Sequence, residues 1–196
     1  MIGRIDTDTL KRMVADEEID TVIAAFPDMY GRLVGKRIVA RFFVDEVMSH
    51  GLHACDYLLA CDMEMDPVPG YAFTSWAKGY GDFRPIPDFD TLRIASWLDR
   101  TALVLCDVYH EDRHELVPVA PRSILRRQLA RAAELGFTAM TASELELYVF
   151  RDSYDTAAEK GFINLQPIGR AIEDYHILQG TKEEFLIGDI RTHLER

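Results

Sequence analysis

Residues 144–150 read Glu, Leu, Glu, Leu, Tyr, Val, Phe, so acidic and apolar side chains alternate before the segment ends in aromatic and apolar residues. Because successive side chains of a β-strand point to opposite faces, Glu144 and Glu146 are expected on one face and the leucines in a core. Two hard oxygen ligands on one face suit Mg²⁺ or Mn²⁺. The same spacing also fits an amphipathic strand with a solvated acidic face, so spacing alone leaves both interpretations open.

The elements that would position these carboxylates predict an α+β fold. The order of apolar and turn-forming residues predicts a small mixed sheet with one or two helices in the first hundred residues and a second unit that opens near Pro118. Helices are expected over residues 9–18, 44–50, 121–136 and 181–194, and strands over residues 21–26, 34–42, 91–97, 102–108 and, once or twice, within 137–150.

A long connection over residues 61–90 is rich in Pro, Gly, Asp and aromatic residues. Connections of this length are usually functional or disordered. Disordered segments are depleted in aromatic residues, so this one is expected to be an ordered loop that packs on another part of the protein. Its aromatic residues are Tyr71, Phe73, Trp76, Tyr80 and Phe83.

Composition excludes several classes of protein. The formal charge of −11, from 33 acidic and 22 basic residues, argues against binding to nucleic acid or to an anionic membrane. No stretch approaches the roughly 20 apolar residues of a membrane span, and the first residues lack the apolar core of a signal peptide, so a cytoplasmic location is expected. Three cysteines without a Cys-x-x-Cys spacing predict buried free thiols at positions 55, 61 and 106.

Residues 136–150 resemble the first metal-binding strand of the glutamine synthetase family, in which a Glu-x-Glu is followed by aromatic and apolar residues. Residues 102–108 and 119–125 look like the link from the N-terminal domain of that family into its catalytic domain. The motif Gly-Asp-Phe at 81–83, with Pro-Asp at 87–88, resembles the acidic loop ahead of that link. The likeness covers residues 18–196, and the ordered combination is more specific than any single motif.

The resemblance implies an ATP-dependent ligase that joins L-glutamate to ammonia or an amine through a γ-glutamyl phosphate. Glu144 and Glu146 would each help to hold one of two divalent cations, Mg²⁺ or Mn²⁺, with ATP as a substrate. The implied domains are a β-grasp-like N-terminal domain, residues 1–112, and the first, truncated part of an α/β catalytic domain, residues 113–196.

The family assembles as a homo-oligomeric ring in which a loop of the N-terminal domain completes the active site of the neighbouring subunit. By position, Asp82 would be a catalytic residue lent to that neighbour and Ser75 a substrate-binding residue. A loop-stabilising hydrogen bond for Asp82 and a turn role for Ser75 explain the same residues without catalysis.

The sequence departs from the ammonia-using members, which carry an Asp before a Gly and paired serines in this loop. Here residues 73–82 read Phe-Thr-Ser-Trp-Ala-Lys-Gly-Tyr-Gly-Asp. This wording looks more like the branch that γ-glutamylates polyamines or other amines.

The remaining metal ligands of the family, and the arginines that hold glutamate and the ATP phosphates, are expected beyond residue 196. These 196 residues alone are therefore predicted to lack appreciable ligase activity. Two other classes stay open: a non-catalytic assembly or regulatory module, and a small metal-dependent hydrolase. The hydrolase ranks last because no third ligand or general base is apparent.

Overall fold

The computed structural model describes residues 3–112 and 114–195, which fall into two compact units, Met1–Ala139 and Met140–Arg196. The first unit contains α1 (Thr7–Ala15), β1 (Thr21–Pro27), β2 (Leu33–Val39), α2 (Ala40–Phe42), the π-helical turn η1 (Phe43–Val47), α3 (Met48–His50), β3 (Ala54–Cys55), the 3₁₀ turns η2 (Asp56–Leu59) and η3 (Trp76–Lys78), β4 (Asp82–Ile94), β5 (Thr101–His110) and α4 (Pro121–Glu134). The second contains α5 (Tyr154–Glu159), α6 (Ile177–Gly180), the 3₁₀ turn η4 (Thr181–Glu183) and α7 (Glu184–Glu195).

The strands of the first unit form one mixed sheet in the order β2-β1-β5-β4-β3. The central strands β1 and β5 are parallel, and the other neighbouring pairs are antiparallel. A parallel pair requires a crossover connection, and here the crossover contains α2, α3 and the long loop. The predicted α+β class and mixed sheet are therefore confirmed.

Strand β4 begins at Asp82, nine residues before the predicted start at residue 91. The prediction missed this first part because proline is uncommon inside a paired strand, and Pro85 and Pro87 lie in it. The carbonyl oxygen of Pro85 accepts a hydrogen bond from the backbone N–H of Leu52 at 2.9 Å, on the side away from β5. In a β-strand, the backbone N–H and the carbonyl oxygen of one residue point to the same side. The side on which a proline lacks its N–H is therefore the side to which its carbonyl oxygen points. Pro85 and Pro87, two residues apart, therefore take no donor from the ladder with β5.

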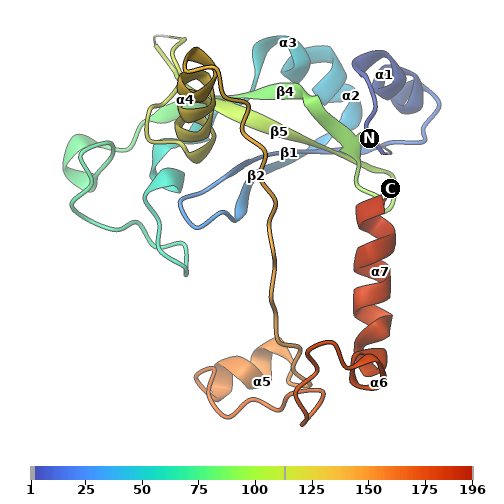
Figure 1. Cartoon of the computed structure of the whole chain (residues 1–196). Coiled ribbons are helices and arrows are strands. Elements are labelled where there is room, and N and C mark those ends of the chain that lie inside the picture. The colour runs from blue at the N-terminus through green and yellow to red at the C-terminus, as the bar shows by residue number, and fades with distance from the viewer. Residues whose placement is uncertain (1–2, 113, 196) are drawn as a thin grey trace. The chain divides into compact units, whose positions relative to one another are not determined.

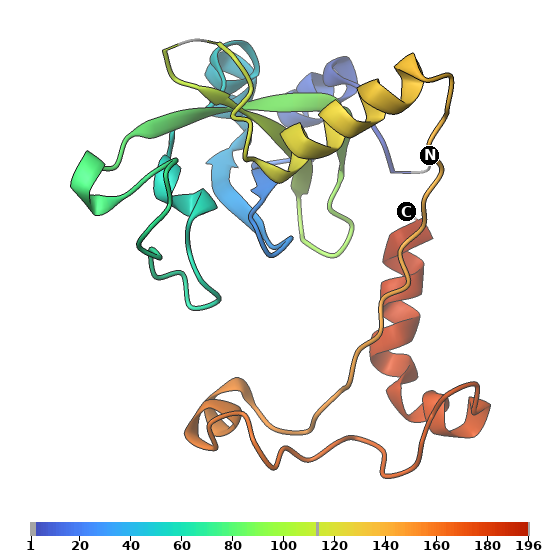
Figure 2. The same ribbon diagram turned by 60° about the vertical axis from the view of Figure 1, so that its left-hand side comes forward.

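The core lies mainly on one face of the sheet. Val22 and Ala24 of β1 and Val104 and Cys106 of β5 share a buried cluster with Leu10 of α1. Figure 1 shows α1, α2 and α3 grouped on that side. Asp107 alternates with Cys106 and so points to the opposite face, where α4 runs along the sheet (Figure 2).

The helices follow local sequence signals. The Asp6 side chain caps α1 by accepting from the Thr9 N–H at 2.7 Å, and this bond lowers the pKa of Asp6. The helix predicted at 9–18 starts earlier, at Thr7, because Asp6 caps it. It also ends earlier, at Ala15, and Glu17 beyond it has a left-handed backbone conformation, φ 59°. The strand predicted at 34–42 ends at Val39, where the chain turns directly into α2.

The hairpin between β1 and β2 turns on a buried acid. One carboxylate oxygen of Asp28, which is 2% exposed, accepts from the backbone N–H groups of Tyr30 and Arg32 at 2.9 Å. The other accepts from the Arg32 guanidinium at 2.7 Å. That guanidinium also donates to the carbonyls of Asp62 and Met63, so one arginine joins the hairpin to the start of the long loop.

The second unit has little core. Ala157 is the one buried hydrophobic residue among its described positions. Asp152 compensates by accepting from the Lys160 ammonium and, at 2.6 Å, from the Gln166 N–H. The Lys160 contact holds the pKa of Asp152 below its usual value. Along the described chain, no helix is long and apolar enough to cross a membrane.

The backbones of β1 and β2 approach each other closely at Gly35. It lies opposite Ala25, and a Cβ added there would lie 2.1 Å from the Ala24 carbonyl oxygen and 2.7 Å from the Ala25 Cα. Backbone atoms cannot move aside as a flexible side chain can, so Gly35→Ala is expected to lower the free energy of unfolding by about 3 kcal/mol. Urea denaturation measures this, with the neighbouring Lys36→Ala as the control, which should change it by less than about 0.5 kcal/mol. Equal effects of the two substitutions would contradict the packing.

The cysteines provide a second test. All three are free, as predicted, but Cys55 is only half-buried whereas Cys61 and Cys106 are buried. Burial raises the pKa of the Cys61 thiol, and it raises that of Cys106 to about 12. Because the thiolate is the reactive form, one thiol per native chain should react rapidly with a disulfide reagent at pH 8, and two should react slowly.

Cys55→Ser should remove that fast phase and leave the slow ones unchanged. Three equal rates in the native protein would be incompatible with this arrangement, and unfolding in urea provides the reference in which all three thiols react.

Candidate functional site

The predicted metal ligands Glu144 and Glu146 both lie exposed, on a stretch without helix or strand. The strand expected within residues 137–150 is therefore not formed, and this prediction was wrong. Leu145 is 85% exposed and Leu147 54%, so these leucines do not point into a core.

The physical reason is a missing neighbour. A strand needs a second strand to pair its backbone N–H and C=O groups, and through residue 148 the described chain offers none. Pairing begins only at the far end, where Phe150 bridges Pro167 and the Ile168 N–H donates to the Val149 carbonyl at 3.0 Å. Alternation of polar and apolar side chains was therefore not sufficient to form a strand here.

No group of three or more His, Cys, Asp or Glu side chains that could hold a metal ion occurs among residues 3–112 and 114–195. Glu144 and Glu146 thus supply two carboxylates without a further ligand in the described chain. Their role as metal ligands stays a prediction.

Ser75 and Asp82 lie at the two ends of a short, structured part of the long loop. Ser75 precedes the turn η3 and its carbonyl accepts from the Lys78 N–H at 3.1 Å. Asp82 is the first residue of β4, is exposed, and lies opposite Cys55 of β3. Their catalytic and substrate-binding roles stay predictions.

The loop itself is ordered, as its aromatic residues predicted. Thr74 is 2% exposed and donates to the Asp56 carboxylate at 2.6 Å, while the Asp56 N–H donates to the Gly81 carbonyl at 2.9 Å. Phe73 packs against the core cluster that contains Phe83. These contacts attach residues 73–81 to the turn η2 and to that core cluster.

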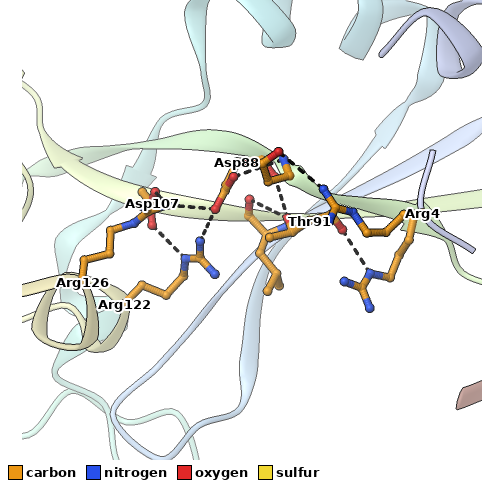
Figure 3. A network of polar contacts seen from close by, with 9 residues as sticks. Arg4, Asp88, Thr91, Asp107, Arg122 and Arg126 are labelled. Carbon is orange, nitrogen blue, oxygen red and sulfur yellow. Dashed lines mark hydrogen bonds and ion pairs between the residues drawn. The ribbon is translucent and has the colours of Figure 1, made fainter. Parts of the chain in front are cut away.

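A cluster of two acids and two arginines joins α4 to the sheet (Figure 3). Arg122 donates to Asp107 of β5 at 2.8 Å and also binds Asp88 of β4. Arg126, one helical turn on, binds the same two carboxylates, with 2.8 Å to Asp88. The Asp107 side chain is 9% exposed and that of Asp88 17%, so the arginines compensate two largely buried charges.

This acid–arginine cluster changes the electrostatics around it. The hydrogen bond that the Arg126 guanidinium donates to the Asp107 carboxylate raises the pKa of Arg126, and the attraction of Asp88 adds to this shift. An open pocket of about 320 Å³ lies beside the cluster and is lined by Asp88, Asp90, Asp107, Tyr109 and Arg126, among others. Since its two innermost acids already bind arginines, the cluster connects elements rather than offering free ligands.

Sequence reasoning missed this cluster. It placed Asp88 in an acidic loop and did not pair it with the arginines of α4. The available signal was Asp107 within an apolar strand, because a buried carboxylate must be paired.

Comparison with known proteins bears directly on the family. A family model described as "Glutamine synthetase, catalytic domain" matches residues 118–193. Gamma-glutamylethanolamide synthetase GlnA4 of Streptomyces coelicolor is 46% identical over 97% of this chain and 41% of its own length. The chain belongs to the glutamine synthetase family.

Other members of the glutamine synthetase family match over similar ranges. Glutamate--isopropylamine ligase of a Pseudomonas species is 28% identical over 94% of this chain and 40% of its own. Among solved structures, a GmaS/ADP complex matches with a TM-score of 0.50 and 25% identity over 64% of this chain and 26% of that chain.

The chain thus spans about two fifths of the length of each of the two named ligases. The matched catalytic-domain region begins at residue 118, whereas the first compact unit extends to Ala139 and includes α4. The predicted domain boundary at 112/113 therefore stays a prediction.

The acid–arginine cluster predicts a large effect of one substitution. Arg122→Ala leaves two largely buried carboxylates with only Arg126, whose side chain is 46% exposed. The free energy of unfolding should fall by about 2 kcal/mol, less than the full cost of orphaning a buried ion pair, because Arg126 remains.

Urea denaturation measures the Arg122 effect, and Arg127→Ala is the matched control, since Arg127 is exposed on the same helix and should contribute less than about 0.5 kcal/mol. A loss from Arg127→Ala as large as that from Arg122→Ala would contradict the cluster as the source of the effect, because Ala has a higher helix propensity than Arg and the helix itself would not be weakened.

Proposed function

We propose that this chain is the N-terminal portion of an ATP-dependent ligase that joins the γ-carboxyl group of L-glutamate to an amine. The 46% identity to gamma-glutamylethanolamide synthetase GlnA4 over 97% of the chain is the observation that carries the proposal. Its name and that of glutamate--isopropylamine ligase each specify an organic amine, which favours an organic amine over ammonia as the acceptor.

The reaction has two balanced steps. The γ-phosphoryl group of ATP passes to a γ-carboxylate oxygen, and ADP leaves. The amine nitrogen then attacks the carbonyl carbon of the γ-glutamyl phosphate, inorganic phosphate departs, and the nitrogen loses a proton. Both steps develop charge on phosphate oxygens, so positioning and electrostatic stabilisation supply most of the catalysis.

In this proposal Glu144 and Glu146 hold Mg²⁺ or Mn²⁺. Two carboxylates two residues apart provide hard oxygen ligands, and the cations supply neutralisation of the phosphate charges. The fit is partial, because the described residues bring no third ligand near them. Their exposure agrees with ligands that face other residues of a complete site.

The proposal extends to the architecture. The sheet with its central parallel pair is taken as the β-grasp-like N-terminal domain, residues 1–112, and residues 113–196 as the start of the catalytic domain. The complete protein is proposed to form a homo-oligomeric ring in the cytoplasm, with Asp82 as a catalytic residue lent to the neighbouring subunit and Ser75 as a substrate-binding residue. Polyamines are the alternative acceptor class within this proposal.

The function can be tested with a chimaera in which this chain replaces the matching 190-residue region of the Streptomyces coelicolor GlnA4. Phosphate release from ATP and L-glutamate is measured with ethanolamine, isopropylamine, putrescine and ammonia, for the chimaera and for the 196-residue chain alone. Activity of the chimaera with an organic amine, and none for the chain alone, is expected. A fully folded chimaera that is inactive with every acceptor would favour a non-catalytic assembly module.

The metal ligands have their own prediction. Glu144→Gln and Glu146→Gln in the chimaera should each lower kcat/KM at least 100-fold, because a neutral amide replaces a charged ligand. Raising the Mg²⁺ or Mn²⁺ concentration should restore part of that loss. Glu134→Gln, at the exposed end of α4, is the control and should retain activity within about twofold. Unchanged activity of both ligand variants would refute the assignment.

A further inference from the structure

Strand β2 lies at one edge of the sheet, with β1 as its neighbour (Figure 1). At one end of this pair the Asp28 N–H donates to the Arg32 carbonyl at 2.9 Å. At the other end the Ala40 N–H donates to the Asp20 carbonyl at 2.8 Å. Because the backbone groups of successive strand residues point to opposite sides, the even-numbered residues of β2 turn theirs toward β1. The residues whose backbone groups point away from the sheet are therefore Leu33, Gly35, Arg37 and Val39.

This outward row of backbone groups lies in water. Its residues are all exposed, and the side chains of Leu33 and Val39 belong to the exposed large hydrophobic residues, at 56% and 69%. β2 contains no proline, so each residue of the row keeps a backbone donor as well as an acceptor. Unpaired backbone groups at a sheet edge are a template for a further strand. A strand added here would also cover the two apolar side chains.

The side chains of β2 indicate which strand fits. Apolar residues lie two and three positions from Lys36 on both sides, and next to Lys36 a glycine on one side matches an arginine on the other. If two β2 strands pair antiparallel with Lys36 opposite Lys36, apolar residues face apolar residues and each glycine leaves room for the long side chain opposite. The facing pairs are Leu33 with Val39, Val34 with Ile38, and Gly35 with Arg37, each formed twice. In this register the outward backbone groups of the two strands face one another, so donors meet acceptors.

We infer that β2 is a homodimerisation edge, at which the β2 strands of two copies of this chain pair antiparallel across a twofold axis at Lys36. A twofold contact requires a surface that is complementary to itself, and the symmetry of the β2 sequence meets this requirement. The inference does not rest on the proposed function. It concerns a contact separate from the loop contact of the proposed ring.

One contact of this dimer is unfavourable. The two Lys36 side chains lie opposite each other, and like charges directly opposite on a sheet are destabilising. The formal charge of −11 on each copy adds repulsion at longer range. Dissolved salt screens both repulsions. The dimer should therefore become tighter as the ionic strength rises, whereas an association through ion pairs of opposite charge would become weaker.

Disulfide cross-linking of the 196-residue chain tests the register. The background variant is Cys55→Ser, which removes the half-buried thiol. Lys36→Cys places two thiols opposite each other, at a Cα separation of about 4.5 Å that a disulfide can span. In Arg37→Cys, the matched control, each new thiol faces Gly35 of the other copy. The two thiols are then offset by two residues along the strands, beyond the roughly 7 Å that a disulfide tolerates between Cα atoms.

Mild oxidation should therefore produce covalent dimers of Lys36→Cys at least about tenfold faster than covalent dimers of Arg37→Cys. Cys61 and Cys106 are buried in both variants and should contribute equally little.

Backbone variants separate strand pairing from other contacts. Arg37→Pro removes an N–H that points away from β1, so the sheet keeps its ladder while the dimer loses one donor from each copy. Arg37→Ala loses the same side chain and keeps the donor. In analytical ultracentrifugation, Arg37→Pro should raise the dimer dissociation constant at least about tenfold relative to Arg37→Ala. Circular dichroism checks that both variants fold, and the cross-linking comparison decides the question if Arg37→Pro does not.

The charge at Lys36 provides a third measurement. Lys36→Gln removes the like-charge contact and should lower the dimer dissociation constant about threefold. An equal mixture of Lys36→Glu with the unsubstituted chain should contain more heterodimer than random pairing gives, because a glutamate then faces a lysine.

A chain that stays monomeric at every accessible concentration and ionic strength would overturn the inference, as would equal cross-linking rates of the two cysteine variants. Dimers that are as tight in Arg37→Pro as in Arg37→Ala would also overturn it, by locating the contact on another surface, such as the exposed residues 137–149. Selective cross-linking of Lys36→Cys together with an excess of heterodimer would support it. None of these measurements depends on ligase activity, so the failure of the proposed function and the failure of this inference are separate results.

Discussion

The pairing of two largely buried carboxylates with two arginines connects the helix α4 to the sheet. Asp88 and Asp107 come from neighbouring strands, and Arg122 and Arg126 are one turn apart on α4. Without the arginines, two adjacent negative charges would repel each other in a poorly solvated place. Their mutual compensation sets which side of α4 faces the strands.

The two units are stabilised in different ways. In the first unit, an apolar cluster on one face of the sheet packs α1 against the strands. Ion pairs such as that between Asp28 and Arg32 stabilise its turns. In the second, hydrogen bonds of Asp152 replace a core that the described residues scarcely supply. The predicted metal carboxylates thus lie in the part of the chain with the fewest packing constraints.

Sequence reasoning recovered the α+β class and most elements of the first unit because their apolar periodicity is decided locally. It misplaced the start of β4, since the orientation of Pro85 and Pro87 depends on which side of the strand is paired. It also predicted a strand around Glu144 from alternation alone, although a strand exists only with a partner. The acid–arginine cluster was missed for the same reason: its four members come from three elements, and only the fold brings them together.

The two prolines of β4 have a further consequence for the sheet as a whole. Their ring nitrogens point away from β5, toward the side where β3 pairs only with Asp82 and Phe83. A strand from another molecule that approached this side would find donors absent at alternate positions, whereas β2 at the opposite edge contains no proline. The two edges of the sheet therefore differ as sites of strand addition. Another strand can pair with the backbone of β2, whereas the prolines obstruct such pairing at the opposite edge.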